Sequence, residues 1–85
     1  MKTFNYVITD DQGIHARPAG ILVKEAKKYT SKITMSAGGK NAEATKLMAI
    51  MGMGIKKGTE VTISVDGADE DTAAADMEKF FKENL

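Results

Sequence analysis

The 85-residue chain contains no cysteine and no tryptophan, and it has one histidine, one arginine and one proline. The absence of cysteine excludes a disulfide framework, a thiolate nucleophile and a cysteine-held zinc or iron–sulfur site, and it is typical of a reducing cytoplasm. With one histidine and scattered acidic residues, the sequence has no metal-ligand spacing. We therefore expect neither a metal nor another cofactor.

Long hydrophobic runs are also missing. The longest nearly apolar stretch, Leu47–Ile55, is far shorter than the roughly 20 residues that a membrane-spanning helix needs. The N-terminal sequence MKTFNYVITDD has no apolar run followed by a cleavage site of small residues. We expect a soluble cytoplasmic protein without membrane insertion. The length suits one domain over residues 1–85 with one modest core, and it excludes a two-domain enzyme.

The formal net charge is zero, with 12 basic and 12 acidic residues, but the charges are unevenly distributed. Residues 1–58 contain ten basic and four acidic residues, a net +6, whereas residues 59–85 contain two basic and eight acidic residues, a net −6. These regions could be two solvated faces, or the basic region could attract acidic proteins or a phosphoryl group. The few aromatic residues are not interleaved with the basic ones, which argues against nucleic acid as a partner.

Four segments have the alternating apolar pattern of a strand. The first covers residues 4–8. The second, residues 33–37, is followed by Gly38-Gly39, which favours a hairpin turn, and by a weaker return strand over residues 42–44. The clearest strand pattern is EVTISVD, residues 60–66.

Three other segments are predicted to be helical. Ala16–Lys28 has apolar side chains at helical spacing, with Pro18 in the first turn, where a missing N–H is tolerated. Thr45–Met53 is a short apolar segment ended by glycines. The last helix follows Asp69, a candidate N-cap. Its buried face is expected to hold Ala73, Met77, Phe80 and Phe81.

The resulting order, β-α-β-β-α-β-α, predicts an α+β fold in which amphipathic helices cover one face of an antiparallel sheet. No repeat, linker or low-complexity tract divides the chain. The ferredoxin-like split βαβ arrangement is a near neighbour of this pattern, and the sequence separates the two poorly.

The stretch GIHARPAG, residues 13–20, contains the only histidine, arginine and proline of the chain. His15 directly precedes a predicted helix, where free backbone N–H groups and the helix dipole attract anions. The positive helix end favours the neutral imidazole, whose ring nitrogen is a nucleophile. Arg17 adds a guanidinium whose planar fork matches phosphate oxygens. A lone histidine is often only a turn residue, but this grouping indicates a nucleophile that takes up a phosphoryl group.

GIHARPA resembles the active-site signature of the HPr family, the histidine-containing phosphocarrier proteins of the bacterial phosphoenolpyruvate–sugar phosphotransferase system (PTS). The likeness extends to the GGK hairpin, the Met-rich segment LMAIMGMG and the stretch VTISVDGADE. It implies an open-faced β-sandwich: a four-stranded antiparallel sheet, in the order first, fourth, second, third, with three helices on one face.

The resemblance also implies a carrier and not an enzyme. His15 would accept a phosphoryl group on Nδ1 from enzyme I, itself charged by phosphoenolpyruvate, and pass it to sugar-specific EIIA proteins or domains. Arg17 is similar to the family's phosphate-stabilising arginine, and Ala16 and Arg17 would supply backbone donors. The chain alone would turn over no small molecule, and a monomer is expected.

The Thr45–Met53 helix is apolar on all sides, so one sheet cannot cover every side chain. Ile50 is expected to face the core. The other large side chains are either further core or an adaptable surface that several partners can use. The resemblance favours a docking surface around the histidine, formed by Gly20, Ile21, Lys24, Lys27, Lys46, Leu47, Met48 and Met51.

The sequence departs from many Gram-positive members of the family at Lys46, where they have a serine phosphorylated by a regulatory kinase. Lysine has no hydroxyl, so this regulation cannot occur there, and Lys46 instead adds positive charge that favours acidic partners. Thr45 is expected to cap the short helix, with a substitute phosphorylation site as the alternative. Asp10 and Asp11 are expected to cap the turn before His15, next to a flexible Gly13.

Three alternative functions remain open. The chain could be an enzyme that uses His15 covalently on a small substrate, although no second general acid lies near the histidine in the sequence. It could be a regulatory module of the same fold that carries no phosphoryl group. It could also be a carrier in a nitrogen-related instead of a sugar-related branch.

Overall fold

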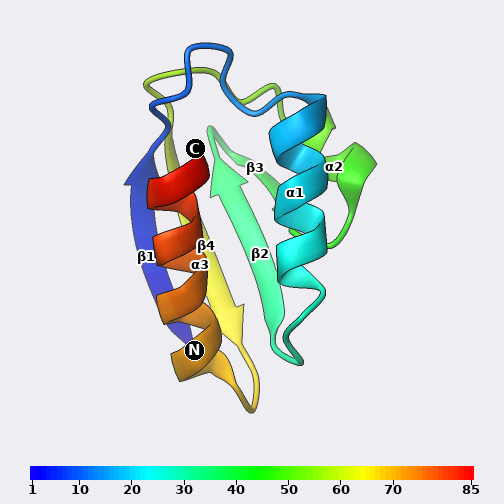
Figure 1. Ribbon diagram of the computed structural model, residues 1–85, viewed down its shortest axis with the longest axis vertical. Helices are drawn as coiled ribbons and strands as arrows, with labels where there is room; N and C mark the ends of the chain where they lie inside the picture. The colour runs from blue at the N-terminus through cyan, green and yellow to red at the C-terminus, as the bar shows by residue number, and fades with distance from the viewer.

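The computed structural model describes residues 1–85 and has the predicted order of strands and helices (Figure 1). All strand pairs are antiparallel, and the sheet order β1-β4-β2-β3 is the one that the family resemblance implies. The helices cover one face of the sheet, which confirms the open-faced β-sandwich. The elements are β1 (Lys2–Val7), α1 (Ala16–Ala26), β2 (Lys32–Ala37), β3 (Lys40–Glu43), α2 (Leu47–Gly52), β4 (Glu60–Asp66) and α3 (Glu70–Asn84).

The core lies between the sheet and the helices. Strand alternation places Met35 and Ile63 on the covered face, where both are fully buried, while Thr, Ser and Asn side chains occupy the open face. Phe81 of α3 packs edge-to-face against Phe4 and Tyr6 of β1, with ring centroids 5.8 and 5.7 Å apart. The predicted buried face of α3 is confirmed: Ala73, Met77, Phe80 and Phe81 are all buried.

The predicted hairpin is present between β2 and β3. Ala37 pairs with Lys40, and Gly38 and Gly39 between them have φ of 56° and 80°. Two successive positive φ values match the right-handed twist of the flanking strands and favour glycine at both positions. None of the helices, of which α3 is the longest with 15 residues, combines the length and apolar character needed to cross a membrane.

One of the two predicted helix caps is correct in position, and the other is wrong. Asp69 is the N-cap residue of α3, as predicted, but its side chain makes no capping bond. Its carboxylate accepts hydrogen bonds from the N–H groups of Thr30 and Ser31, each at 2.9 Å, and from the Ser31 hydroxyl. Three donors from the loop before β2 outcompete one donor of its own helix.

The incorrect cap is Thr45, because the N-cap of α2 is Lys46, which makes no side-chain capping bond. The Lys46 N–H donates to the Glu43 carbonyl at 3.0 Å, and the first helical bond runs from the Ile50 N–H to the Lys46 carbonyl at 3.1 Å. A turn therefore ends at Lys46 before the helix begins. Thr45 lies within this turn and not at the start of the helix.

Candidate functional site

The candidate site lies at the N-terminal end of α1. His15 is the N-cap residue, with an extended backbone (φ −112°, ψ −170°) and no side-chain capping bond. The first helical bond runs from the Ala19 N–H to the His15 carbonyl at 2.9 Å. The N–H groups of Ala16 and Arg17 therefore have no helical acceptor, and Pro18 has no N–H to satisfy. Two free donors thus stand beside the imidazole, where an anion can bind.

The loop before His15 is held against another loop. Gly13 is buried at φ 68°, and a Cβ at this position would overlap the Ile55 carbonyl oxygen. The Ile14 N–H donates to the same carbonyl at 3.0 Å. The expectation that Gly13 is flexible is therefore wrong. It is glycine because the backbone approaches the segment before β4 too closely for a side chain, and this contact positions His15.

The two aspartates before His15 differ in what they contact. Asp10 closes the turn, as predicted: its Oδ1 accepts from the Gln12 N–H, and its carbonyl accepts from the Gly13 N–H, both at 2.9 Å. Asp11 does not cap this turn. Its carboxylate accepts a hydrogen bond from the Lys57 ammonium at 2.9 Å, which lowers the pKa of Asp11 below its ordinary value. Both partners are exposed, so this link contributes little to stability.

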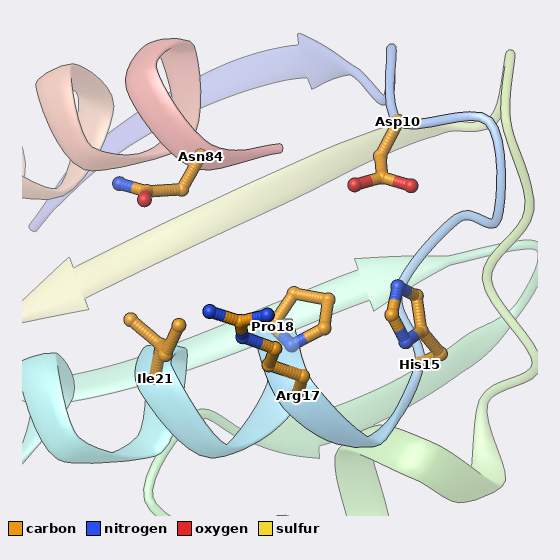
Figure 2. Close-up of a pocket in the computed structure, with 6 residues that line it drawn as sticks. All are labelled: Asp10, His15, Arg17, Pro18, Ile21 and Asn84. Carbon is orange, nitrogen blue, oxygen red and sulfur yellow. The ribbon is translucent and has the colours of Figure 1, made fainter.

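A pocket of about 340 Å³ lies beside His15. It is lined by Asp10, His15, Arg17, Pro18, Ile21 and Asn84 (Figure 2). The Asp10 side chain points into it from the side opposite α1, and the Asn84 side chain lies beside the end of α3 on that same side; α1 contributes Arg17, Pro18 and Ile21. Neither Asp10 nor Arg17 forms a salt bridge. The predicted pair of His15 and Arg17 is therefore brought together with two residues that sequence reasoning did not place there.

Asn84 comes from the last turn of α3, far along the chain from His15. Its Nδ2 donates to the Phe80 carbonyl at 3.0 Å. The Leu85 carbonyl next to it accepts from the Thr9 and Asp10 N–H groups at 2.7 and 3.0 Å, which ties the end of α3 to the loop before His15. No sequence pattern signals this contact. The polar stretch that contains Asp10 predicts a turn, but it does not predict the direction in which the Asp10 carboxylate points.

The residues of the predicted docking surface lie on α1 and α2 or at their ends, and these two helices pack beside each other (Figure 1). Ile50 is fully buried, as predicted. Leu47, Met48 and Met51 are 40%, 79% and 39% exposed, and Ile21 on α1 is 42% exposed, so these side chains are not simply core. The rest of the surface consists of exposed Lys24, Lys27 and Lys46 and half-buried Gly20.

Residues 2–83 match the family model described as the PTS HPr component phosphorylation site. The chain belongs to the HPr family. It is 49% identical over 73 residues to the phosphocarrier protein HPr of Mycoplasma capricolum subsp. capricolum, over 86% of this chain and 82% of that protein. The fold, and membership of the PTS phosphocarrier proteins implied by the sequence resemblance, are both confirmed.

Solved HPr structures have the same fold. HPr-C-His from Thermoanaerobacter tengcongensis is similar with a TM-score of 0.93 and 32% identity, over 99% of this chain and 94% of that chain. An HPr dimer from the same organism gives a TM-score of 0.77 at 32% identity, over 98% of this chain and 95% of that chain. The likeness to HPr thus covers nearly the whole chain in both sequence and structure.

Proposed function

We propose that His15 carries a phosphoryl group, which it receives from phospho-enzyme I and passes to sugar-specific EIIA proteins or domains, within one domain of residues 1–85. The observation that supports this role is the grouping at one helix end of an imidazole, the Arg17 guanidinium and the free N–H groups of Ala16 and Arg17. His15 is the only histidine of the chain, so no other imidazole stands beside such donors.

In the proposed step, the lone pair of a neutral His15 ring nitrogen attacks the phosphorus. The bond from phosphorus to the donor atom breaks, and its electron pair stays on the donor. The phosphoryl oxygens are then bound by the two N–H groups and by Arg17. Each charge-assisted hydrogen bond contributes about 1.5–3 kcal/mol and the helix end about 0.3–1 kcal/mol. These contributions hold the group but still allow its release.

The surface on α1 and α2 is the proposed docking site for both partners. Exposed methionines adapt to different apolar surfaces because their side chains are unbranched and polarizable. The neighbouring lysines, Lys24, Lys27 and Lys46, favour acidic partners and speed their association. This surface adjoins His15, since α1 begins directly after the histidine and α2 packs beside α1.

The test replaces the proposed carrier residue, His15→Ala. The protein is incubated with phosphoenolpyruvate, Mg²⁺ and a bacterial enzyme I, and its intact mass is measured. We expect one acid-labile phosphoryl group on the wild type and none on the variant. The variant should fold normally, because the His15 side chain makes no hydrogen bond, and circular dichroism checks this. No gain of mass with enzymes I from several bacteria would favour the regulatory module.

Two further alternatives have their own tests. One observation favours an enzyme that acts on a small substrate. The pocket contains an acidic side chain, Asp10, near His15, which the sequence did not lead us to expect there. Hydrolysis of a phosphate ester by the purified chain would support it. A nitrogen-branch carrier would pass its phosphoryl group to a nitrogen-related EIIA protein in preference to a sugar-specific one.

We further propose that the chain works as a monomer in the cytoplasm. The exposed apolar side chains form a small patch with a use in transient complexes, so they need no permanent partner. Sedimentation should give the mass of one chain. A stable dimer would contradict this; a crystal structure of an HPr dimer is known from Thermoanaerobacter tengcongensis.

A further inference from the structure

We propose that the Asp10 carboxylate sets the phosphoryl-transfer potential of the site. By repelling the phosphoryl group on His15, it makes the loaded state less stable and the group easier to pass on. This inference rests on the proposed function of His15, and it assigns a role to a residue that sequence reasoning treated as a turn cap.

The position of Asp10 is fixed from both sides. Its N–H donates to the Leu85 carbonyl at 3.0 Å, and its carbonyl accepts from the Gly13 N–H at 2.9 Å. Its Oδ1 accepts from the Gln12 N–H at 2.9 Å. In Figure 2 the carboxylate points into the pocket, across from the α1 residues and beside the His15 ring. These bonds hold a negative charge at the rim of the proposed phosphoryl site.

No cation forms a salt bridge with this charge. The neighbouring Asp11 is paired with Lys57 at 2.9 Å, whereas Asp10 forms no salt bridge, although Arg17 lines the same pocket. The second oxygen of Asp10 accepts no hydrogen bond from the protein. The field of Asp10 therefore reaches into the pocket, where Arg17 attracts a phosphoryl group and Asp10 repels it.

The expected size follows from the charges. A phosphoryl group adds about two negative charges at neutral pH. The site is open to solvent, so the dielectric constant of water, about 80, applies; repulsion between one carboxylate and two charges about 6–12 Å away then changes an equilibrium about three- to tenfold. The unloaded site contains no such anion, so Asp10 destabilises only the loaded state.

The test is an exchange equilibrium between two proteins. Phosphorylated, ¹⁵N-labelled wild type is mixed with unlabelled, unphosphorylated Asp10→Asn and a catalytic amount of enzyme I, without phosphoenolpyruvate. In each exchange one P–N bond breaks as another forms, so the equilibrium ratio of the two loaded proteins compares their loaded states directly. Enzyme I acts only as a catalyst, so a change in docking alters the rate and not this ratio. Intact mass separates the labelled and unlabelled species.

We expect the loaded form of Asp10→Asn to be favoured about three- to tenfold over loaded wild type at low salt. The preference should fall towards one in 1 M salt, because solvent ions screen the charge. The asparagine retains an oxygen that can accept from the Gln12 N–H. Asp10→Ser, which can also accept in a turn of this kind, is the second variant in case asparagine disturbs the loop.

Two further variants complete the test. One is a control that should not change the equilibrium ratio, and the other should change it in the opposite direction. Asp11→Asn removes the same charge one residue away and outside the pocket, and it should give a ratio near one. Asn84→Asp adds a charge on the far side of the pocket, and its loaded form should be disfavoured. A ratio within twofold of one for both Asp10 variants would overturn the inference. Failure of the wild type to accept any phosphoryl group would instead overturn the proposed function.

Discussion

The two ends of α1 differ in how their polar groups are satisfied. At the N-terminal end, the N–H groups of Ala16 and Arg17 have no helical acceptor, and the charges of Asp10 and Arg17 form no salt bridge. The backbone around them is nevertheless fixed, since Gly13 packs against the segment before β4. This end is rigid in its backbone and unsatisfied in its donors and charges.

Beyond the C-terminal end, the polar groups pair with one another. The Tyr29 hydroxyl lies within 2.9 Å of a Glu25 carboxylate oxygen and 3.0 Å of an Asp76 one, and partial burial together with these carboxylates raises the Tyr29 pKa. Asp69 binds the N–H groups of Thr30 and Ser31. These contacts join the end of α1 and the loop after it to α3.

We infer from this difference that the C-terminal end of α1 serves mainly the stability of the fold and the N-terminal end mainly its function. Paired groups stabilise the native state, whereas donors and charges left free on a fixed backbone are available to a group from outside the protein. Changes at the C-terminal end should therefore affect stability alone, and changes at the N-terminal end should affect phosphoryl transfer, unless they also move the backbone.

Gly13→Ala should have the largest effect on stability. It lies at the N-terminal end of α1, but it should change both the stability and the phosphoryl transfer. The added methyl would overlap the Ile55 carbonyl at a positive φ, so we expect a loss of at least about 2 kcal/mol in the free energy of unfolding. Urea denaturation measures it. The loop that carries His15 must also move, so phosphoryl acceptance should fall. A variant with wild-type stability would show that the contact with Ile55 is not as described.

Asp69→Asn should have a smaller, pH-dependent effect confined to the paired end. Hydrogen bonds from the Ser31 hydroxyl, and then from the Thr30 and Ser31 N–H groups, lower the pKa of Asp69 below its ordinary value of 3.8. A lowered native pKa means that the carboxylate contributes stability above about pH 4, and that this contribution is lost as the pH falls below it.

The measurement for Asp69 is the thermal midpoint as a function of pH. We expect Asp69→Asn to melt below the wild type at pH 6 and the two curves to converge towards pH 2, roughly the range over which such a carboxylate becomes protonated. Phosphoryl acceptance at pH 7 should remain at the wild-type level. A difference in midpoint that stays constant with pH would contradict the role of the charge.

Gly20→Ala should have the smallest effect and the opposite sign. A Cβ at Gly20 meets no atom within 4 Å, and alanine is a better residue than glycine inside a helix by about 0.5–1 kcal/mol. The variant should therefore unfold at a higher urea concentration. Since Gly20 lies on the proposed docking surface, the rate of phosphoryl transfer from enzyme I is measured alongside. A loss of stability would mean that the space beside α1 is not open.

Much of this arrangement follows from local sequence. Strand alternation and helical spacing predict most elements, because each buried face repeats at the period of its own backbone; α2 is instead predicted from a short apolar segment ended by glycines. The candidate site at His15 can also be predicted from local sequence, since a histidine, an arginine and a helix start lie within a few residues. The burial of Ile50 beside exposed Met48 likewise follows from a short helix that can bury only one side.

The remaining features depend on contacts between distant segments. Asp69 resembles a helix cap in the sequence, but the loop before β2 provides more donors. Asn84 reaches the pocket only because α3 packs against β1 and ends beside the loop before His15. The need for glycine at position 13 comes from Ile55, far along the chain. Periodicity and capping rules describe neighbours in sequence, so they do not contain these contacts.

The most direct test of the contrast between the two ends is to record the backbone amide NMR signals before and after phosphorylation by enzyme I. We predict the largest shifts at Ala16 and Arg17, whose N–H groups would gain a phosphoryl acceptor, and almost none at Thr30 and Ser31, whose N–H groups already bind Asp69. Unchanged signals at Ala16 and Arg17 in a protein that has gained one phosphoryl group, or larger shifts at Thr30 and Ser31, would contradict the account.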